Sequence, residues 1–309
     1  MTAIGGGGSE APLPGEAIKA VPLRHWWRMV FAIIIIGFLV GFVIDAAQRP
    51  AYDWNAFGKY IFDRRITAAA LVTLELTVLS MIVAIVLGLL LAMMRLSPNP
   101  VLKGVAWLYI WLFRGTPVYV QLVFWGLLAT IYHTIDLGLP FNRPWLSLST
   151  TDVLNTFQLA VIGLSLNEAA YMAEIVRAGL LSVDRGQGEV STALGMSWGQ
   201  TMRYVVIPQS MRIIIPPTGN EVISMLKTTS LVTAVPFSLD LYTRSRDISA
   251  ETFNPIPLLL VASAWYLFFT SILMVGQYFL EKRFSRGAGA MHIGPKEPPA
   301  GTAPVVTPA

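Results

Sequence analysis

Long uninterrupted apolar runs constrain this chain more than any other feature. Two of them read "VFAIIIIGFLVGFVI" and "IVAIVLGLLLAMM", and neither contains a charged residue. A run of about 20 apolar residues is what a helix needs to cross a bilayer. The chain is 54% hydrophobic and only 13% charged, whereas an average soluble domain is about 25% charged. We therefore predict an all-α membrane protein.

The apolar runs divide into about six transmembrane helices. We expect these spans at about residues 27–46, 66–94, 118–133, 154–181, 208–235 and 256–280, with a further aromatic helix at 101–113. The tails at 1–26 and 285–309 are rich in Gly, Pro and Ala and are predicted to be disordered.

Basic residues predict the orientation of the chain, because six spans leave both termini on one side. If that side is the cytoplasm, fourteen Lys and Arg residues face inward, seven face outward and Lys227 lies within or near a span, which accounts for all 22. Cytoplasmic loops carry an excess of basic residues. We therefore expect both termini in the cytoplasm. Basic residues at helix ends also explain the net charge of +4 without nucleic-acid binding.

The stretch "GQGEVSTALGMSWGQTMRYVVIPQ" then forms the longest cytoplasmic loop. We predict a short helix from Gln187 to Leu194, which Gly195 ends by taking the left-handed backbone conformation. Ser197 is expected to cap a second short helix, and Pro208 fits the first turn of the fifth span. This pattern predicts a rigid helix–turn–helix unit. A pair of amphipathic helices lying on the bilayer is the alternative.

Several polar residues fall within the predicted spans. An ionisable group in the hydrocarbon region is costly and usually faces a bundle interior or a water-filled cavity. Helical spacing puts some of these residues on shared faces, where they would hold the ammonium and carboxylate groups of a substrate. The candidates for a substrate pathway are Asn167, Glu168, Tyr171, Asn220, Glu221, Ser224, Lys227 and Thr228. Hydrogen bonding between helices for packing alone explains any single one of them equally well.

Two further groups have a structural interpretation. In "FRGTP", Arg114 precedes Gly115 and Pro117, which break the helix. The break is either a hinge or a plain helix end. Glu174 and Arg177 are spaced i and i+3 near the cytoplasmic end of the fourth span, where an ion pair would steady the approach to the loop.

The loop resembles the coupling loop of the permeases of ATP-binding-cassette (ABC) importers. "EVS" at 189–191, Gly195 and "VVIP" at 205–208 match that family's Glu-Ala-Ala, Gly and aliphatic-x-aliphatic-Pro positions at the family's spacing, with Val and Ser in place of two alanines. A literal "EAA" at 168–170 lies inside the fourth span and is not the loop motif. "FRGTP", "AAYMAEIVRAG", "PQSMRIIIPP" and "NEVISMLKTTSL" resemble permeases for polar amino acids.

The resemblance implies a five-helix permease domain at 66–284, with a coupling loop at 184–208 and an added N-terminal span at 27–47. It implies import of a small polar or charged amino acid, driven by an ABC ATPase dimer that docks on the loop and binds the ATP and Mg, so that this chain binds no cofactor. Further implied partners are a second permease copy or a related subunit and an extracytoplasmic amino-acid-binding protein. The residues implied in coupling are Gly186, Gln187, Glu189, Gly195 and Pro208.

Other classes of function fit the sequence less well. The chain has no cysteine for disulfides or metal ligands and no Gly-x-x-x-x-Gly-Lys-Ser/Thr phosphate loop. No nucleophile–base or metal cluster points to an enzyme. An ion-gradient-driven secondary amino-acid transporter is the alternative, although such folds usually contain inverted repeats and no matching halves are evident.

Overall fold

The computed structural model describes residues 26–138 and 144–284. The predicted disordered tails therefore lie outside the described residues, apart from Trp26. The chain divides into two compact units, Met1–Tyr52 and Asp53–Ala309, and each is described by itself.

Within its described residues, the first unit is a single long apolar helix, α1 (Trp26–Gln48), followed by a 3₁₀ turn at Pro50–Tyr52. None of the side chains of α1 is buried. The predicted first span therefore exists as a helix that is long and apolar enough to cross a membrane. Its unburied apolar surface suits lipid, because lipid tails are as apolar as the side chains they meet.

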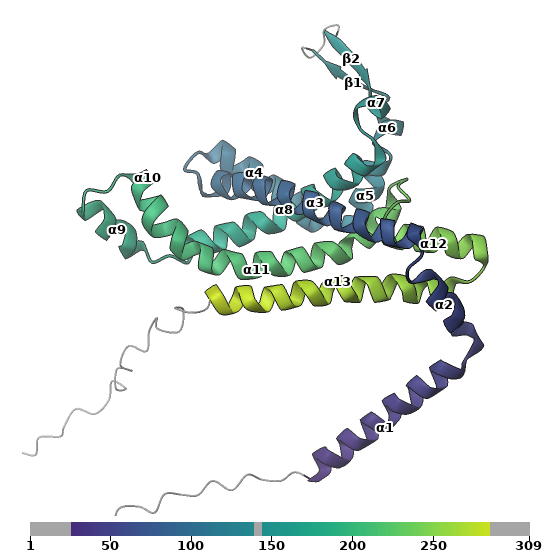
Figure 1. The fold of residues 1–309 in the computed structure, drawn as a ribbon. Coiled ribbons are helices and arrows are strands. Elements are labelled where there is room, and N and C mark those ends of the chain that lie inside the picture. The colour runs from purple at the N-terminus through teal and green to yellow at the C-terminus, as the bar shows by residue number, and fades with distance from the viewer. Residues whose placement is uncertain (1–25, 139–143, 285–309) are drawn as a thin grey trace, which may run out of the picture. The chain divides into compact units, whose positions relative to one another are not determined.

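The second unit is a bundle of four long helices, α3 (Arg64–Leu96), α8 (Thr156–Leu181), α11 (Ile207–Thr228) and α13 (Pro255–Phe284). Figure 1 shows them running side by side, and α3 packs along much of α8. Shorter helices complete the unit, namely α2 (Trp54–Tyr60), α4 (Pro100–Gly115), α5 (Val118–Gly126), α6 (Leu128–Ile131), α7 (Thr150–Val153), α9 (Arg185–Ala193), α10 (Trp198–Thr201) and α12 (Leu241–Thr252).

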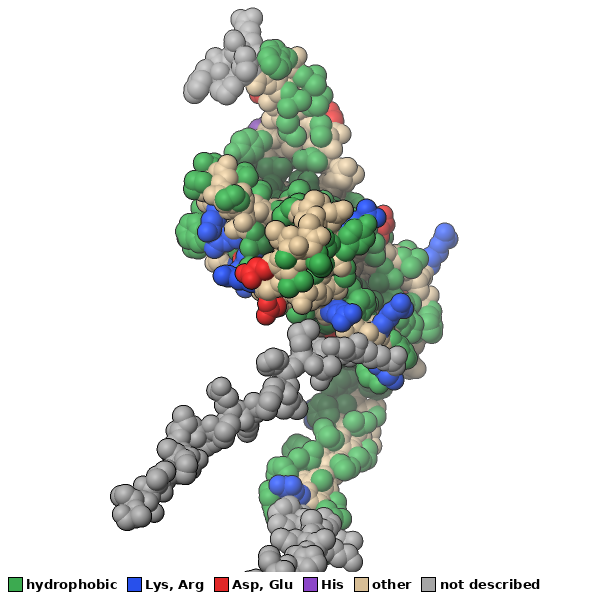
Figure 2. All heavy atoms as spheres, turned by 90° about the vertical axis from the view of Figure 1, so that its left-hand side faces the viewer, with side chains coloured by type: hydrophobic (Ala, Val, Ile, Leu, Met, Phe, Trp, Pro, Cys, Tyr) green, Lys and Arg blue, Asp and Glu red, His purple; other side chains and the backbone are tan. Residues whose placement is uncertain are grey.

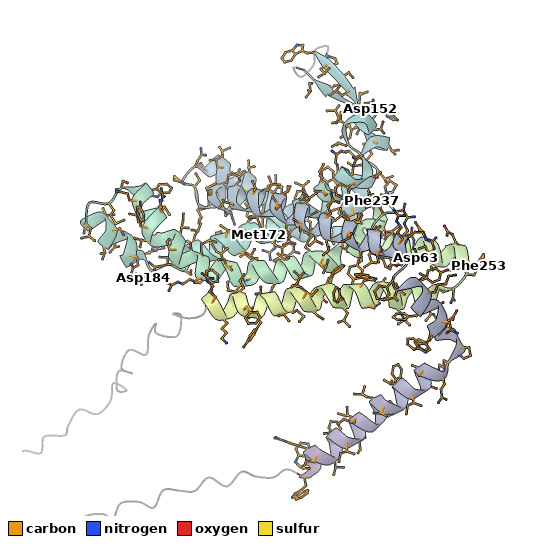
Figure 3. The ribbon with its side chains drawn as sticks, in the orientation of Figure 1. Asp63, Asp152, Met172, Asp184, Phe237 and Phe253 are labelled. Carbon is orange, nitrogen blue, oxygen red and sulfur yellow. The ribbon has the colours of Figure 1, made fainter. Side chains whose placement is uncertain are left out.

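Small residues allow the long helices to approach closely. A Cβ atom added to Gly88 of α3 would lie 2.5 Å from the Cβ of Met172 of α8, and Figure 3 labels Met172 within the bundle. A Cβ added to Gly219 of α11 would collide with the amide of Gln277 of α13. Close approach between helices through small residues is how membrane helices gain packing energy.

The third predicted span is the clearest departure from the sequence prediction. Residues 118–133 form α5 and α6, of nine and four residues, and nine residues extend only about 14 Å. The run is apolar throughout, so apolarity alone could not reveal that its helix ends at Gly126. The fifth predicted span, 208–235, forms α11 as far as Thr228 and then a 3₁₀ segment to Ala234.

A β-hairpin follows α6 and was not predicted. Strands β1 (Thr134–Leu137) and β2 (Leu146–Ser149) pair antiparallel, with Thr134 opposite Ser149. The hairpin stands away from the four long helices (Figure 1). Both strands are only four residues long, too short for an alternating pattern to be distinguished from a loop.

Candidate functional site

The two carboxylates predicted for the substrate pathway come together in the bundle. Glu168 of α8 is buried, with 8% of its surface exposed. Its Oε1 atom has no hydrogen-bond partner among the described residues. The carboxyl group of Glu221, on α11, interacts directly with that of Glu168. Two adjacent carboxylates repel one another, so a shared proton or a nearby positive charge stabilises the pair.

Arg114 brings one positive charge to the same region. It lies in the last turn of α4, and its guanidinium sits over the ring of Tyr171 of α8, 5.1 Å from the ring centroid. Arg114 also interacts electrostatically with Glu221. No ion pair within 4 Å joins the two among the described residues, so the guanidinium remains available for a further partner.

A clamp of side-chain amides holds the turn that carries Arg114. Nε2 of Gln121 donates to the carbonyl oxygens of Phe113 and Thr116, at 3.0 and 3.1 Å, and to Oγ1 of Thr116, at 2.7 Å. Nδ2 of Asn167 donates to the same Phe113 oxygen at 2.9 Å and to Oε1 of Gln121 at 3.2 Å. The carbonyl groups left free where α4 ends are therefore satisfied by α5 and α8. This clamp fixes the break after Arg114 relative to Glu168.

The clamp changes the interpretation of two predictions. Asn167 was predicted to line the substrate pathway, but its amide bonds to the helix break. The "RGTP" segment was predicted as a hinge or a plain helix end, and the clamp ties its carbonyl groups to neighbouring helices. Gln121 was not among the predicted residues, and neither was Tyr109, whose hydroxyl donates to Leu166 O at 2.8 Å. The signal for Gln121 was a lone amide in an apolar run.

The remaining pathway candidates lie along α11. Asn220 and Lys227 are exposed, seven residues apart and so on one face of the helix. Thr228 donates to the carbonyl oxygen of Ser224, so its hydroxyl serves its own helix. Within the described residues, no hydrogen bond or ion pair joins these four side chains to Glu168 or Glu221. They instead give α11 a polar outer face.

The predicted ion pair between Glu174 and Arg177 is present. Nη2 of Arg177 lies 2.7 Å from Oε2 of Glu174, and both side chains are partly exposed. The pair sits near the end of α8 that leads to α9, as the i, i+3 spacing predicted.

The helix–turn–helix unit predicted after the fourth span is present. Asp184 caps α9 (Figure 3). Gly195 then has φ +76°, the predicted left-handed conformation. Ser197 and Gln200 form a reciprocal capping box at the start of α10. Glu189 is exposed on α9, and the apolar side chains of Val190, Leu194 and Trp198 are exposed beside it.

One part of that prediction was wrong. We expected the second short helix to end before Pro208, but α10 continues through a π-helical turn, Met202–Val206, directly into α11. Pro208 lies in the first turn of α11, as predicted, and that turn directly follows the π-helical turn. α10 and α11 therefore form one connected rod.

Comparison with known proteins fits this geometry. Residues 84–286 match the family described as binding-protein-dependent transport system inner membrane component. The chain belongs to this family of ABC transporter permeases.

Its relatives are amino-acid permeases. The chain is 59% identical over 274 residues to the arginine transport system permease protein ArgU of Corynebacterium glutamicum, covering 88% of this chain and 85% of that protein. It is 31% identical to the nopaline transport permease NocM of Agrobacterium fabrum, covering 73% and 91%.

Solved structures agree on the fold. A crystal structure of an amino acid ABC transporter with histidines matches with a TM-score of 0.59 and 32% identity, over 71% of this chain and 94% of that one. The MetNI methionine transporter shares the fold, at a TM-score of 0.52 and 15% identity, over 73% and 97%.

Proposed function

We propose that this chain is the permease subunit of an ATP-driven importer for cationic amino acids, with arginine as the preferred substrate. The observation that carries the proposal is the Glu168–Glu221 pair with Arg114 beside it. Arginine carries two positive groups and one carboxylate, and the site offers two carboxylates and one guanidinium. A neutral amino acid such as glutamine would leave one carboxylate of the site without a counter-charge, which is costly in a low-dielectric bundle.

The similarity to the arginine permease ArgU supports the same substrate class. Arg114 would face the substrate carboxylate, since arginine and carboxylate groups form strong charge-assisted hydrogen bonds.

Coupling to ATP hydrolysis is proposed to run through the α9–α10 unit. Its exposed apolar side chains and Glu189 would dock on a separate ATPase dimer that binds ATP and Mg. Because α10 continues into α11, movement of the docked unit would move α11 and with it Glu221. From Ile207 to Glu221 that rod is about 21 Å long.

The remaining partners and the orientation follow from the same proposal. Both termini and the α9–α10 unit would lie in the cytoplasm of a cell-membrane protein. The exposed polar face of α11, with Asn220 and Lys227, would be closed by a second permease copy or a related subunit. An extracytoplasmic binding protein would deliver the amino acid at the opposite end.

Uptake by the permease–ATPase complex in proteoliposomes tests the proposal. Arginine should be taken up when ATP is present on the side of the membrane that the ATPase subunits face. Glu168→Gln or Glu221→Gln should raise the arginine concentration needed for half-maximal uptake roughly tenfold to a hundredfold, as expected for a hydrogen bond to a charged group. Glu75→Gln is the matched control, because Glu75 is an exposed carboxylate on α3.

Two results would contradict the proposal. Normal arginine uptake by both site variants would remove the carboxylate pair from substrate recognition. Uptake driven by an ion gradient in the absence of any ATPase would instead identify a secondary transporter.

A further inference from the structure

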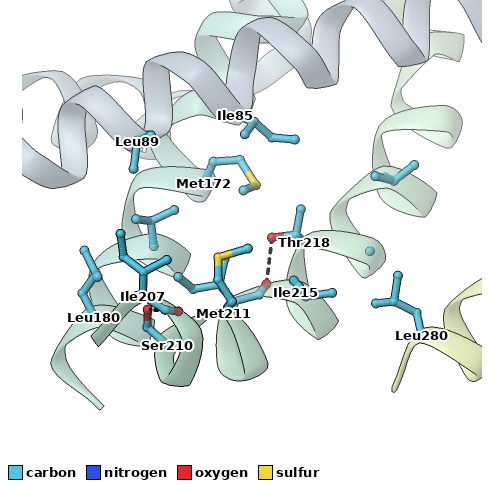
Figure 4. A pocket seen from close by; sticks show the side chains of 14 residues that line it. Ile85, Leu89, Met172, Leu180, Ile207, Ser210, Met211, Ile215, Thr218 and Leu280 are labelled. Carbon is cyan, nitrogen blue, oxygen red and sulfur yellow. Dashed lines mark hydrogen bonds between the residues drawn. The ribbon is translucent and has the colours of Figure 1, made fainter. Parts of the chain in front are cut away.

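A large apolar cavity lies among the helices of the bundle, and none of the polar-site residues Arg114, Glu168 and Glu221 lines it. Its volume is about 510 Å³, within the range of small-molecule sites. The side chains around it come from α3, α8 and α11, with Leu280 from α13 (Figure 4). Only two hydroxyl groups line it, and both donate to their own helix, Ser210 to Ile207 O at 3.0 Å and Thr218 to Ile214 O at 2.8 Å. The cavity therefore suits a ligand whose enclosed portion carries no polar group.

The cavity faces away from the polar face of α11. Its lining residues Thr218 and Val222 lie two positions before and after Asn220, and two positions in an α-helix correspond to a rotation of about 200°. The polar face is the one that a second permease would close under the proposed function. The cavity face is left to the surrounding lipid.

Two basic residues lie next to lining residues of the cavity. Arg283 is one turn beyond Leu280 on α13, and Arg212 lies between the lining residues Met211 and Ile214 on α11. Both side chains are exposed and neither forms an ion pair among the described residues. The neighbouring carboxylate of Glu281 accepts a hydrogen bond from Gln277 at 2.8 Å. Arg212 and Arg283 lie toward the end of the bundle that carries α9 and α10. Figure 2 views that end, with Lys and Arg side chains in blue.

We propose that the cavity binds one acyl chain of an anionic phospholipid, whose phosphate is held by Arg212 and Arg283. The inference rests on the proposed function for its orientation, which places this end in the anionic cytoplasmic leaflet. Basic pockets between membrane helices on that side bind anionic head groups. The lipid would fill the space between α11 and its neighbours α3 and α8, and so would brace the rod that links the coupling unit to Glu221.

Native mass spectrometry of the delipidated permease–ATPase complex tests this site. The probes are dioleoyl phosphatidylglycerol and dioleoyl phosphatidylcholine. Phosphatidylglycerol should bind more tightly, and Arg212→Gln or Arg283→Gln should each weaken it roughly fivefold, since one basic contact is worth about 1 kcal/mol. Leu89→Trp should fill the cavity and remove binding of both lipids. Leu90→Trp and Lys103→Gln are the controls, because Leu90 is equally exposed but outside the lining and Lys103 is an exposed lysine on α4.

Three outcomes would overturn the proposal. These are unchanged phosphatidylglycerol binding in Leu89→Trp, equal binding of the two lipids, or a second permease helix seated in the cavity in a cryo-EM map. The readout is lipid mass rather than transport. A failed arginine assay with normal lipid binding would reject the proposed substrate alone.

Discussion

Gln121 is the single residue on which the turn after Arg114 depends most. Its amide group reaches two carbonyl oxygens and one hydroxyl. A buried acceptor that loses its donor costs about 1–3 kcal/mol. The cost falls at the point that positions Arg114 over Tyr171, so the helix break and the position of the Arg114 guanidinium depend on the same side chain.

Replacing Gln121 by Met should separate these two roles. Gln121→Met keeps the length of the side chain and removes its donors, so we expect arginine affinity of the purified complex to fall about tenfold, or 1.4 kcal/mol. Agmatine, which is arginine without its carboxylate, should lose much less affinity, because it makes no contact that needs Arg114. Isothermal titration of both ligands measures the difference, and an equal loss for both would show that the clamp serves stability alone.

Gly195 allows a second residue-scale prediction. Gly195→Ala places a Cβ on a left-handed residue, which costs about 1–2 kcal/mol, although no atom lies within 4 Å of that Cβ. We expect this variant to keep arginine binding and to lose most of the arginine-stimulated ATPase activity.

Gly188→Ala is the matched control for this experiment. Gly188 also has open space around it, but it lies inside α9 with ordinary helical backbone. Alanine should stabilise that helix by about 0.5–1 kcal/mol and leave coupling intact. If both variants lost coupling equally, the left-handed turn would not be the reason.

At the scale of elements, two helix caps should respond to pH in opposite directions. Asp240 caps α12 and is completely buried, and burial raises the pKa of its carboxyl group. Asp63 caps α3, and its hydrogen bond to Arg65 lowers the pKa of its carboxyl group. A raised pKa means that the folded state binds the proton more readily, so stability falls as pH rises through that pKa. A lowered pKa means that the unfolded state binds the proton more readily, so stability falls as pH falls through that pKa.

The corresponding variants should differ in sign. Asn caps a helix as well as Asp, so Asp240→Asn should melt higher than the parent at pH 7 and lose that advantage near pH 4. Asp63→Asn should be destabilised by about 0.5 kcal/mol at pH 7, as for an exposed pair, and match the parent at low pH. Thermal melts in detergent between pH 4 and pH 7 measure both variants. If the melting temperatures of the two variants changed with pH in the same way as that of the parent, the two pKa directions would be contradicted.

The helices themselves were predictable to different degrees. The ends of α3, α8 and α13 follow apolar runs bounded by polar residues, so the sequence located them within a few positions. The break within 118–133 was not predictable, because the residues around Gly126 are as apolar as those of a continuous span. Glu168 and Glu221 were found as costly residues in spans, but their contact depends on how α8 packs against α11. No pattern within one helix contains that information.

At the scale of the whole molecule, we expect α1 to be dispensable for the stability of the bundle. None of its side chains is buried and it belongs to a separate compact unit. A chain that begins at Asp53 should therefore retain the melting temperature of the full-length protein within about 2–3 °C, corresponding to less than about 1 kcal/mol in a domain of this size. Circular dichroism in detergent measures this, and a much larger loss would show that α1 packs on the bundle in the folded protein.

The π-helical turn at Met202–Val206 sets the angular phase between α10 and α11. A wide turn accommodates one residue more than an α-helical turn, and each residue of an α-helix adds about 100° of rotation. Deleting one residue here would close the wide turn to an ordinary α-helical turn and keep α10 and α11 in phase. The same deletion within α11 has no wide turn to absorb it and would rotate Trp198 and α9 by about 100° around the helix axis. The wide turn is therefore the position at which permeases of this kind can differ by one residue in length and still present α9 and α10 at the same angle.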